Sequence, residues 1–163
     1  MAVRNEWADA SVEAGKKGNP AIVSGNHKLG FVTTFEIAAG DDDASIIKIA
    51  KLPANAILTK LDLYCDALTG CTSVDAGLYK ESGVVADVNI YASAKDIAAG
   101  QAIGSPENMM ADVPLESLHK RAFELLGLTA ATKTEQAYNL ALTFNTIGSG
   151  AGTVTVVGEY ILG

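Results

Sequence analysis

The sequence predicts an all-β fold, namely an antiparallel β-sandwich or jelly roll with one or two short helical insertions and an extended N-terminal arm. Apolar and polar residues alternate with a period of two through several runs that begin at residue 29. Short turn signals such as AAGDDD, LPANA and IGSGAG separate these runs, and connections this short join antiparallel strands. The 163 residues, 48% apolar and 19% charged, suit one domain.

The alternation gives each predicted strand one core face and one solvent face. The residues expected on core faces are Phe31, Thr33, Phe35 and Ile37, then Ile57, Thr59, Leu61 and Leu63, then Val74, Ala76 and Leu78, then Tyr138, Leu140, Leu142 and Phe144, and then Val154, Val156 and Tyr160. Lys60, Asp62 and Tyr64 are expected on the opposite face of their strand. The run ASIIKIAKL alternates more weakly, which favours a strand covered on both faces.

Residues 80–135 contain two helical patterns and are expected to form an excursion between the early strands and the last two. The run SAKDIAAG is typical of a helix of one or two turns, with Ser93 as N-cap and Gly100 just past the end. The run VPLESLHKRAFELLGL has leucines at helical spacing and Gly127 where a left-handed cap belongs. It predicts a helix between about Pro114 and Leu126.

The first 28 residues follow neither the strand period nor the helix period, and they are rich in Gly, Lys and Asn. We interpret residues 1–28 as an extended arm and residues 29–163 as a single β-sandwich domain. Apolar side chains in the arm are costly to leave in water, so they are expected to contact a partner. The expected contact residues are Val3, Trp7, Val12, Lys16, Lys17, Ile22 and Val23. A tail packed on its own domain is the alternative.

The net charge of the chain limits the kinds of partner that it can bind. A net charge of −7 and a pI near 4.7 repel phosphate backbones and anionic lipid, so neither nucleic acid nor membrane is expected as a partner. No run approaches the roughly 20 apolar residues of a membrane span, and the N-terminus lacks a signal-peptide pattern. Cys65 and Cys71 are too few for a disulfide framework, which suits a reducing cytosol. We expect two buried or half-buried thiols, with pairing across the Leu68–Gly70 turn as the alternative.

The sequence offers little apparatus for chemistry, so no enzyme activity, cofactor or metal is predicted. His27 and His119 have no partner at metal-ligand spacing and are expected to be solvated. The run of aspartates at 41–43 is typical of a charged hairpin tip, with calcium as the alternative. The GSGAG run at 148–152 precedes a strand, whereas a dinucleotide-binding loop follows one, so we expect a hairpin loop.

Three stretches carry a resemblance to known proteins. They are IIKIAKLPANAILTKLDLYCDALTGCTSVDAGLY, KRAFELLGLTA and AYNLALTFNTIGSGAGTVTVVGEYILG. Together they resemble a group of small structural proteins of tailed bacteriophages, in which a Leu-Pro turn introduces a long hairpin, a leucine-rich helical segment follows, and a Thr/Val-rich strand ends the chain. The resemblance covers about residues 29–163 and does not include the arm.

The resemblance implies a head decoration, or cement, protein that binds the outside of a phage capsid and bridges coat subunits. The expected partner is the major capsid protein, and the expected location is the virion surface after synthesis in the host cytoplasm. A symmetric homo-oligomer is expected, with a trimer favoured over a dimer, because contacts on a capsid occur at symmetry-related junctions. The alternatives are another virion part (a head fibre base, tail or connector protein) and a jelly-roll module that binds a sugar or other small ligand.

Overall fold

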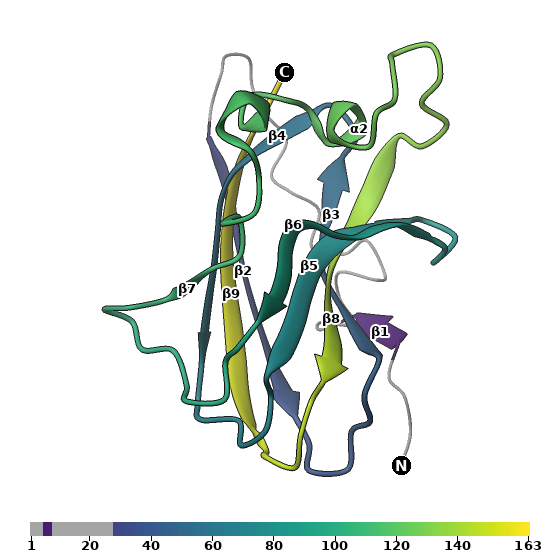
Figure 1. The fold of residues 1–163 in the computed structure, drawn as a ribbon. Coiled ribbons are helices and arrows are strands. Elements are labelled where there is room, and N and C mark those ends of the chain that lie inside the picture. The colour runs from purple at the N-terminus through teal and green to yellow at the C-terminus, as the bar shows by residue number, and fades with distance from the viewer. Residues whose placement is uncertain (1–4, 8–27) are drawn as a thin grey trace.

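The computed structural model describes residues 5–7 and 28–163 of the chain (Figure 1). The strands are β1 (Asn5–Trp7), β2 (Leu29–Ile37), β3 (Ser45–Pro53), β4 (Ala56–Cys65), β5 (Ser73–Lys80), β6 (Val85–Lys95), β7 (Glu107–Asn108), β8 (Ala137–Thr146) and β9 (Gly152–Leu162). A 3-10 helix, η1 (Leu115–Ser117), and one turn of α-helix, α2 (Ala122–Leu125), lie between β7 and β8. No helix in the described part of the chain is long and apolar enough to cross a membrane.

The strands form two packed sheets with the strand order of a jelly roll. One sheet has the order β2-β9-β4-β7, and the other has β3-β8-β5-β6 with β1 added beside β3. Four antiparallel pairs are nested in the sequence: β2 with β9, β3 with β8, β4 with β7, and β5 with β6. This nesting is a long hairpin rolled over on itself, which gives two Greek keys. The predicted all-β antiparallel sandwich is confirmed, and the short β1 pairs in parallel with β3.

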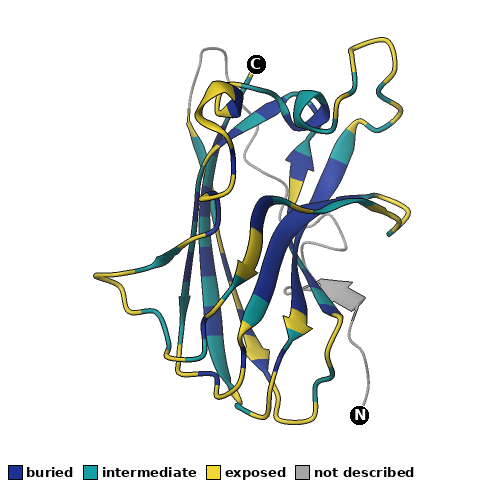
Figure 2. Cartoon of the chain, in the orientation of Figure 1, coloured by how far each residue is buried: buried dark blue, intermediate teal, exposed yellow. Residues whose placement is uncertain are grey.

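The core lies between the two sheets, where the alternating apolar residues meet (Figure 2). Phe35 of β2 and Phe144 of β8 contact edge to face, with ring centroids 6.2 Å apart, and so join the two sheets. The Thr33 hydroxyl donates a hydrogen bond of 2.8 Å to the carbonyl of Ile49 and makes a second link between the sheets. The faces predicted for β2 and β9 are confirmed by their alternating burial.

Two bulges change the faces predicted for the strands β3 and β4. The register of β4 on β9 shifts between Leu58 and Lys60, so Leu58 is buried while Thr59 is exposed. The prediction that Ile57 and Thr59 share the face of Leu61 is therefore wrong, because one extra residue reverses the alternation. The register of β3 on β8 shifts between Lys48 and Ala50, and beyond this bulge Lys51 is exposed, so β3 is not covered on both faces.

The helix predicted at SAKDIAAG is wrong in its first half. Residues 85–95 form β6, which pairs with β5, so much of the expected excursion belongs to the sheet. The Ser93 N–H donates 2.7 Å to a carboxylate oxygen of Asp112 instead of entering a helix. Gly100 has the expected positive φ of 79°, but it closes a single turn in which its N–H donates to the Ile97 carbonyl.

The helix predicted between Pro114 and Leu126 is divided into η1 and α2. The Phe123 N–H donates to the Ala54 carbonyl at 3.2 Å, whereas a continuous helix would use the carbonyl of the preceding turn. This tertiary hydrogen bond, together with burial of the Phe123 ring, fixes the start of α2. Leu115 is 84% exposed because the broken helix does not turn it toward the core.

Most connections pass from one sheet to the other. Among the strands β2 to β9, only β5 and β6 are consecutive in the sequence and also paired with each other, so they form the one hairpin. The loop at 148–152 joins β8 to β9 in the opposite sheet, so the predicted hairpin there is wrong. The same holds for the aspartate run at 41–43 and for the connection from β4 to β5, which the resemblance implied to be a hairpin.

Candidate interaction surfaces

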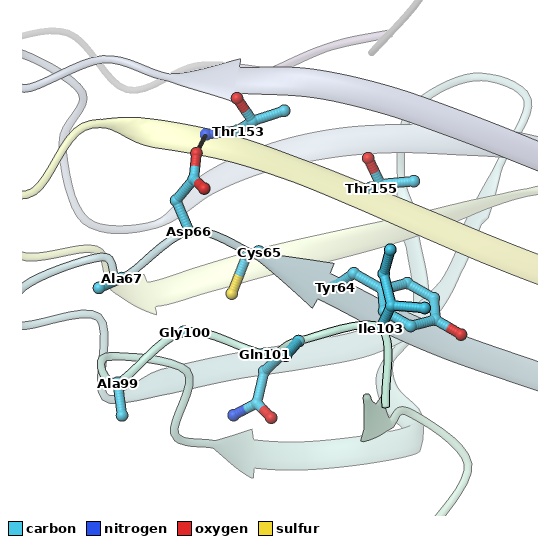
Figure 3. A pocket seen from close by; sticks show the side chains of 11 residues that line it. Tyr64, Cys65, Asp66, Ala67, Ala99, Gly100, Gln101, Ile103, Thr153 and Thr155 are labelled. Atoms are coloured by element: carbon cyan, nitrogen blue, oxygen red, sulfur yellow. Dashed lines mark hydrogen bonds between the residues drawn. The ribbon is translucent and has the colours of Figure 1, made fainter. Parts of the chain in front are cut away.

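An open groove of about 480 Å³ lies at the end of the sandwich where β4 stops (Figure 3). One wall comes from the end of β4 and the start of the next loop, with Tyr64, Cys65 and Asp66. The other walls come from the connection between β6 and β7, residues 99–103, and from two threonines of β9. Ile103 stands at the rim and is 89% exposed.

Backbone hydrogen bonds hold the walls of this groove together. Cys65 and Gln101 exchange two of them, at 3.1 and 2.8 Å, which fix the 99–103 segment beside β4. On the other side, a carboxylate oxygen of Asp66 accepts the Thr153 N–H at 2.9 Å. A Cβ on Gly100 would meet the Ala67 nitrogen at 2.9 Å, so a glycine is needed at this close approach. The groove is therefore a preformed feature of the fold.

The thiol that lines the groove, Cys65, is not an activated nucleophile. Burial raises the pKa of the Cys65 thiol, which keeps it in the protonated, weakly nucleophilic form at neutral pH. The described lining residues include no histidine that could act as its base. Within residues 5–7 and 28–163, no cluster of His, Cys, Asp and Glu is arranged to hold a metal ion.

Both cysteines are free, as the sequence predicted, and their burial leads to a first testable prediction. Cys71 is buried, and burial raises the pKa of its thiol to about 12. At pH 8 we expect the native protein to react slowly at half-buried Cys65 and not at Cys71, because few Cys71 thiolates form. Titration with a chromogenic disulfide reagent should count both thiols only after unfolding. Rapid reaction of two thiols in the native protein would contradict this prediction.

The groove lies at the acidic end of the molecule. Four loops meet there: residues 38–44, 66–72, 96–106 and 147–151 (Figure 1). They contain five aspartates and no Lys, Arg or His. Four of these carboxylates accept a backbone N–H: Asp41 from Ala38, Asp43 from Ile147, Asp66 from Thr153, and Asp96 from Ala98. The aspartates therefore stabilise turns, and their field favours a basic partner surface.

Exposed apolar side chains occur at several separate places on the surface. Leu115 and Leu118 are 84% and 42% exposed around η1. Val84 and Val85 lie at the β5–β6 turn, and Val32 is 68% exposed on the outer face of β2. None of these residues was predicted from the sequence to be a contact. The sequence does contain a signal that Ile103 is an exposed contact residue, because it is a lone large apolar residue within the turn-forming run AAGQAIGSP.

The contact residues predicted in the arm lie almost entirely outside the described residues. Trp7 belongs to β1, where its backbone position is paired with Lys48 of β3. The other predicted contacts lie outside the described residues: Val3, Val12, Lys16, Lys17, Ile22 and Val23. Their role stays a prediction. His27 also lies outside this part, and His119 is exposed, as expected.

Comparison with known proteins places the fold among phage capsid structures. No family model matches the chain, and no curated protein matches its sequence. A chain in the structure described as "Capsid of Ralstonia phage GP4" has a TM-score of 0.61 and 15% identity, over 94% of this chain and 96% of that one. A chain in "Cyanophage Pam1 capsid asymmetric unit" has a TM-score of 0.51 and 17% identity, over 90% and 92%. At such identities the likeness establishes a shared fold.

Proposed function

We propose that the chain is a non-enzymatic structural subunit of a bacteriophage virion, and specifically a decoration, or cement, protein. In this role it binds the outside of the head, contacts the major capsid protein and stabilises the shell by bridging coat subunits. The observation that supports the proposal is the match to a chain of the GP4 capsid over 94% of this chain and 96% of that one.

The surface of the described residues fits a role in protein contacts. A cement subunit needs stiff sheets and exposed apolar side chains for contacts, and Ile103 on the β6–β7 connection and Leu115 on η1 are 89% and 84% exposed. The groove beside Ile103 is open and lined by small and polar residues, which suits a protein segment. For a sugar-binding module it offers a single aromatic ring, Tyr64, so that alternative has less support.

Cosedimentation tests the proposal directly. Heads of the phage that encodes this chain, assembled without it, are mixed with the purified protein and pelleted. We expect saturable binding at a fixed ratio to the coat protein and a higher temperature of capsid disruption in its presence. Binding only to tails or connectors would support the alternative virion role, and the absence of binding to any virion part would refute the proposal.

We propose that the arm makes many of the contacts that bind the protein to the capsid or to a second copy of itself. Lys16 and Lys17 lie in an apolar and glycine-rich context that suits a segment laid along a partner surface. The net negative charge of the chain belongs to the sandwich, because residues 29–163 hold 16 Asp and Glu against 8 Lys and Arg, whereas residues 1–28 hold 3 against 4. The arm is thus the less acidic part of the chain.

Substitution of Lys16→Glu with Lys17→Glu is expected to weaken capsid binding at least about tenfold, since two charges are reversed against an acidic partner surface. Deletion of residues 2–24 should abolish binding altogether. Thermal unfolding of the charge-reversed protein should match the wild type, and Lys120→Glu serves as the control for added negative charge. Cosedimentation isotherms measure the effect, and full binding by the truncated protein would show that the sandwich alone holds the capsid.

A further inference from the structure

Among the residues that the structure describes, one sheet edge, strand β2, differs from the other edges in having none of the usual protections against pairing. An open edge presents unpaired N–H and C=O groups, and natural proteins protect such edges with short strands, bulges, prolines or lysines. The edge strand β7 has two residues and β1 has three. The edge strand β6 pairs with β5 through three register shifts, which curl it. Each of these three edges therefore carries one of the usual protections.

The strand β2 is long, regular and apolar. Its nine residues pair with β9 in unbroken register, and its sequence LGFVTTFEI contains neither proline nor lysine. Within the described part of the chain, β9 is its single strand neighbour. Its outward side chains alternate regularly, and Val32 at the centre of the strand is 68% exposed. These are the features of a strand that accepts another strand at its edge.

The residues of β2 identify the partner strand, because the strand is complementary to itself. In an antiparallel pair of two β2 strands centred on Val32, the residue numbers of two facing residues always add up to 64. Val32 then faces Val32 of the second copy, and Lys28 faces Glu36 at both ends. Outward residues meet outward residues, as the pleat requires. Shifting the register by two residues either way removes the match between Lys28 and Glu36.

We propose that β2 is a dimerisation edge, which pairs antiparallel with β2 of a second copy about a two-fold axis at Val32. The two four-stranded sheets then form one continuous sheet of eight strands. The apolar Val32 pair lies at the centre of the interface, and two Lys28–Glu36 ion pairs lie at its ends. Lys28 already contacts Glu159 at 2.7 Å, and its ammonium has further donors for a second carboxylate. Of the two oligomers that the sequence leaves open, this edge selects the dimer.

The proposal is independent of capsid binding, because it is tested on the isolated full-length chain. Sedimentation equilibrium should show a mass that rises with concentration toward twice 16.8 kDa. Val32→Lys places like charges opposite each other at the axis and should weaken dimerisation at least about tenfold. Val84→Lys is the matched control, because Val84 is similarly exposed at 59% and lies away from β2. At concentrations where the wild type is monomeric, both variants should have the melting temperature of the wild type.

Charge reversal tests the register. Lys28→Glu alone and Glu36→Lys alone should each weaken the dimer, whereas the two together should restore part of it. The ion pairs between the copies are then rebuilt with opposite polarity, although the contact of Lys28 with Glu159 is lost. Val32→Cys should form a disulfide-linked dimer on oxidation, and Val84→Cys should not. A monomer at every concentration up to about 100 µM, a trimer, or a dimer unaffected by Val32→Lys would overturn the proposal. Loss of capsid binding by Val32→Lys in a monomeric protein would instead assign the edge to a coat-protein strand.

Discussion

Replacing Gly77 by alanine is expected to lower the free energy of unfolding by about 3 kcal/mol, at the upper end of the cost of overpacking. Gly77 lies in the middle of β5, and β6 crosses directly over it. A Cβ at this position would overlap the carbonyl oxygen of Asp87 and the backbone of Val88. Both obstacles are main chain, so no rotamer change can relieve the overlap, and β6 has to move away from the sheet.

Thermal unfolding measures this effect. For a chain of this size, a loss of about 3 kcal/mol lowers the melting temperature by roughly 6 to 12 °C. Gly40→Ala is the matched control, because a Cβ there meets nothing within 4 Å and its effect should stay within about 0.5 kcal/mol. A melting temperature unchanged by Gly77→Ala would mean that β6 does not cross β5 as described.

The crossing at Gly77 also shows why part of this fold could not be predicted from the sequence. Between the first and last paired residues, β5 advances five positions, from Val74 to Tyr79, while β6 advances ten, from Val85 to Lys95. The surplus residues bulge across the sheet, so β6 loses the period-two alternation that identifies a strand. The C-terminal part of β6 contains Ser93, a residue type that commonly caps the start of a helix, and was therefore predicted to be helical.

The faces of the regular strands could be predicted because nothing interrupts their pleat. Phe35 and Ile37 of β2, and Val154 and Val156 of β9, are buried as their spacing predicted. In β4, a bulge after Leu58 reverses the faces of the residues before it, and the alternation alone did not reveal it. Turn residues indicated where the chain reverses, but they did not indicate which sheet receives the next strand.

The candidate surfaces were harder to predict than the core. A core residue is recognised by its own spacing, whereas a contact surface depends on which loops the fold brings together. Ile103 becomes notable only beside Tyr64 and Gln101, which the topology places at the same end. The open edge of β2 is likewise recognised only after the neighbouring strands are known, because the same nine residues inside a sheet would pair with a strand on each side.

Replacing Phe144 by alanine is expected to destabilise the protein by about 3 to 5 kcal/mol, a large part of the total stability of a single domain. Phe144 is fully buried on β8, between β3 and β5, and its ring contacts Phe35 from the opposite sheet. Alanine removes this contact and leaves a cavity at the junction of the two sheets, which a sandwich bonded along both edges of β8 cannot close by collapsing. The melting temperature should fall by roughly 6 to 20 °C.

Controls separate loss of this contact from general loss of apolar surface. Phe144→Leu keeps most of the buried volume and should cost less than half as much, while Val84→Ala, at a side chain that is 59% exposed, should change the stability by no more than about 0.5 kcal/mol. A double-mutant cycle of Phe144→Leu with Phe35→Leu should give a coupling of about 0.5 to 1.5 kcal/mol, because the two rings contact edge to face. Additive effects in that cycle would show that the rings do not stabilise the sandwich through each other.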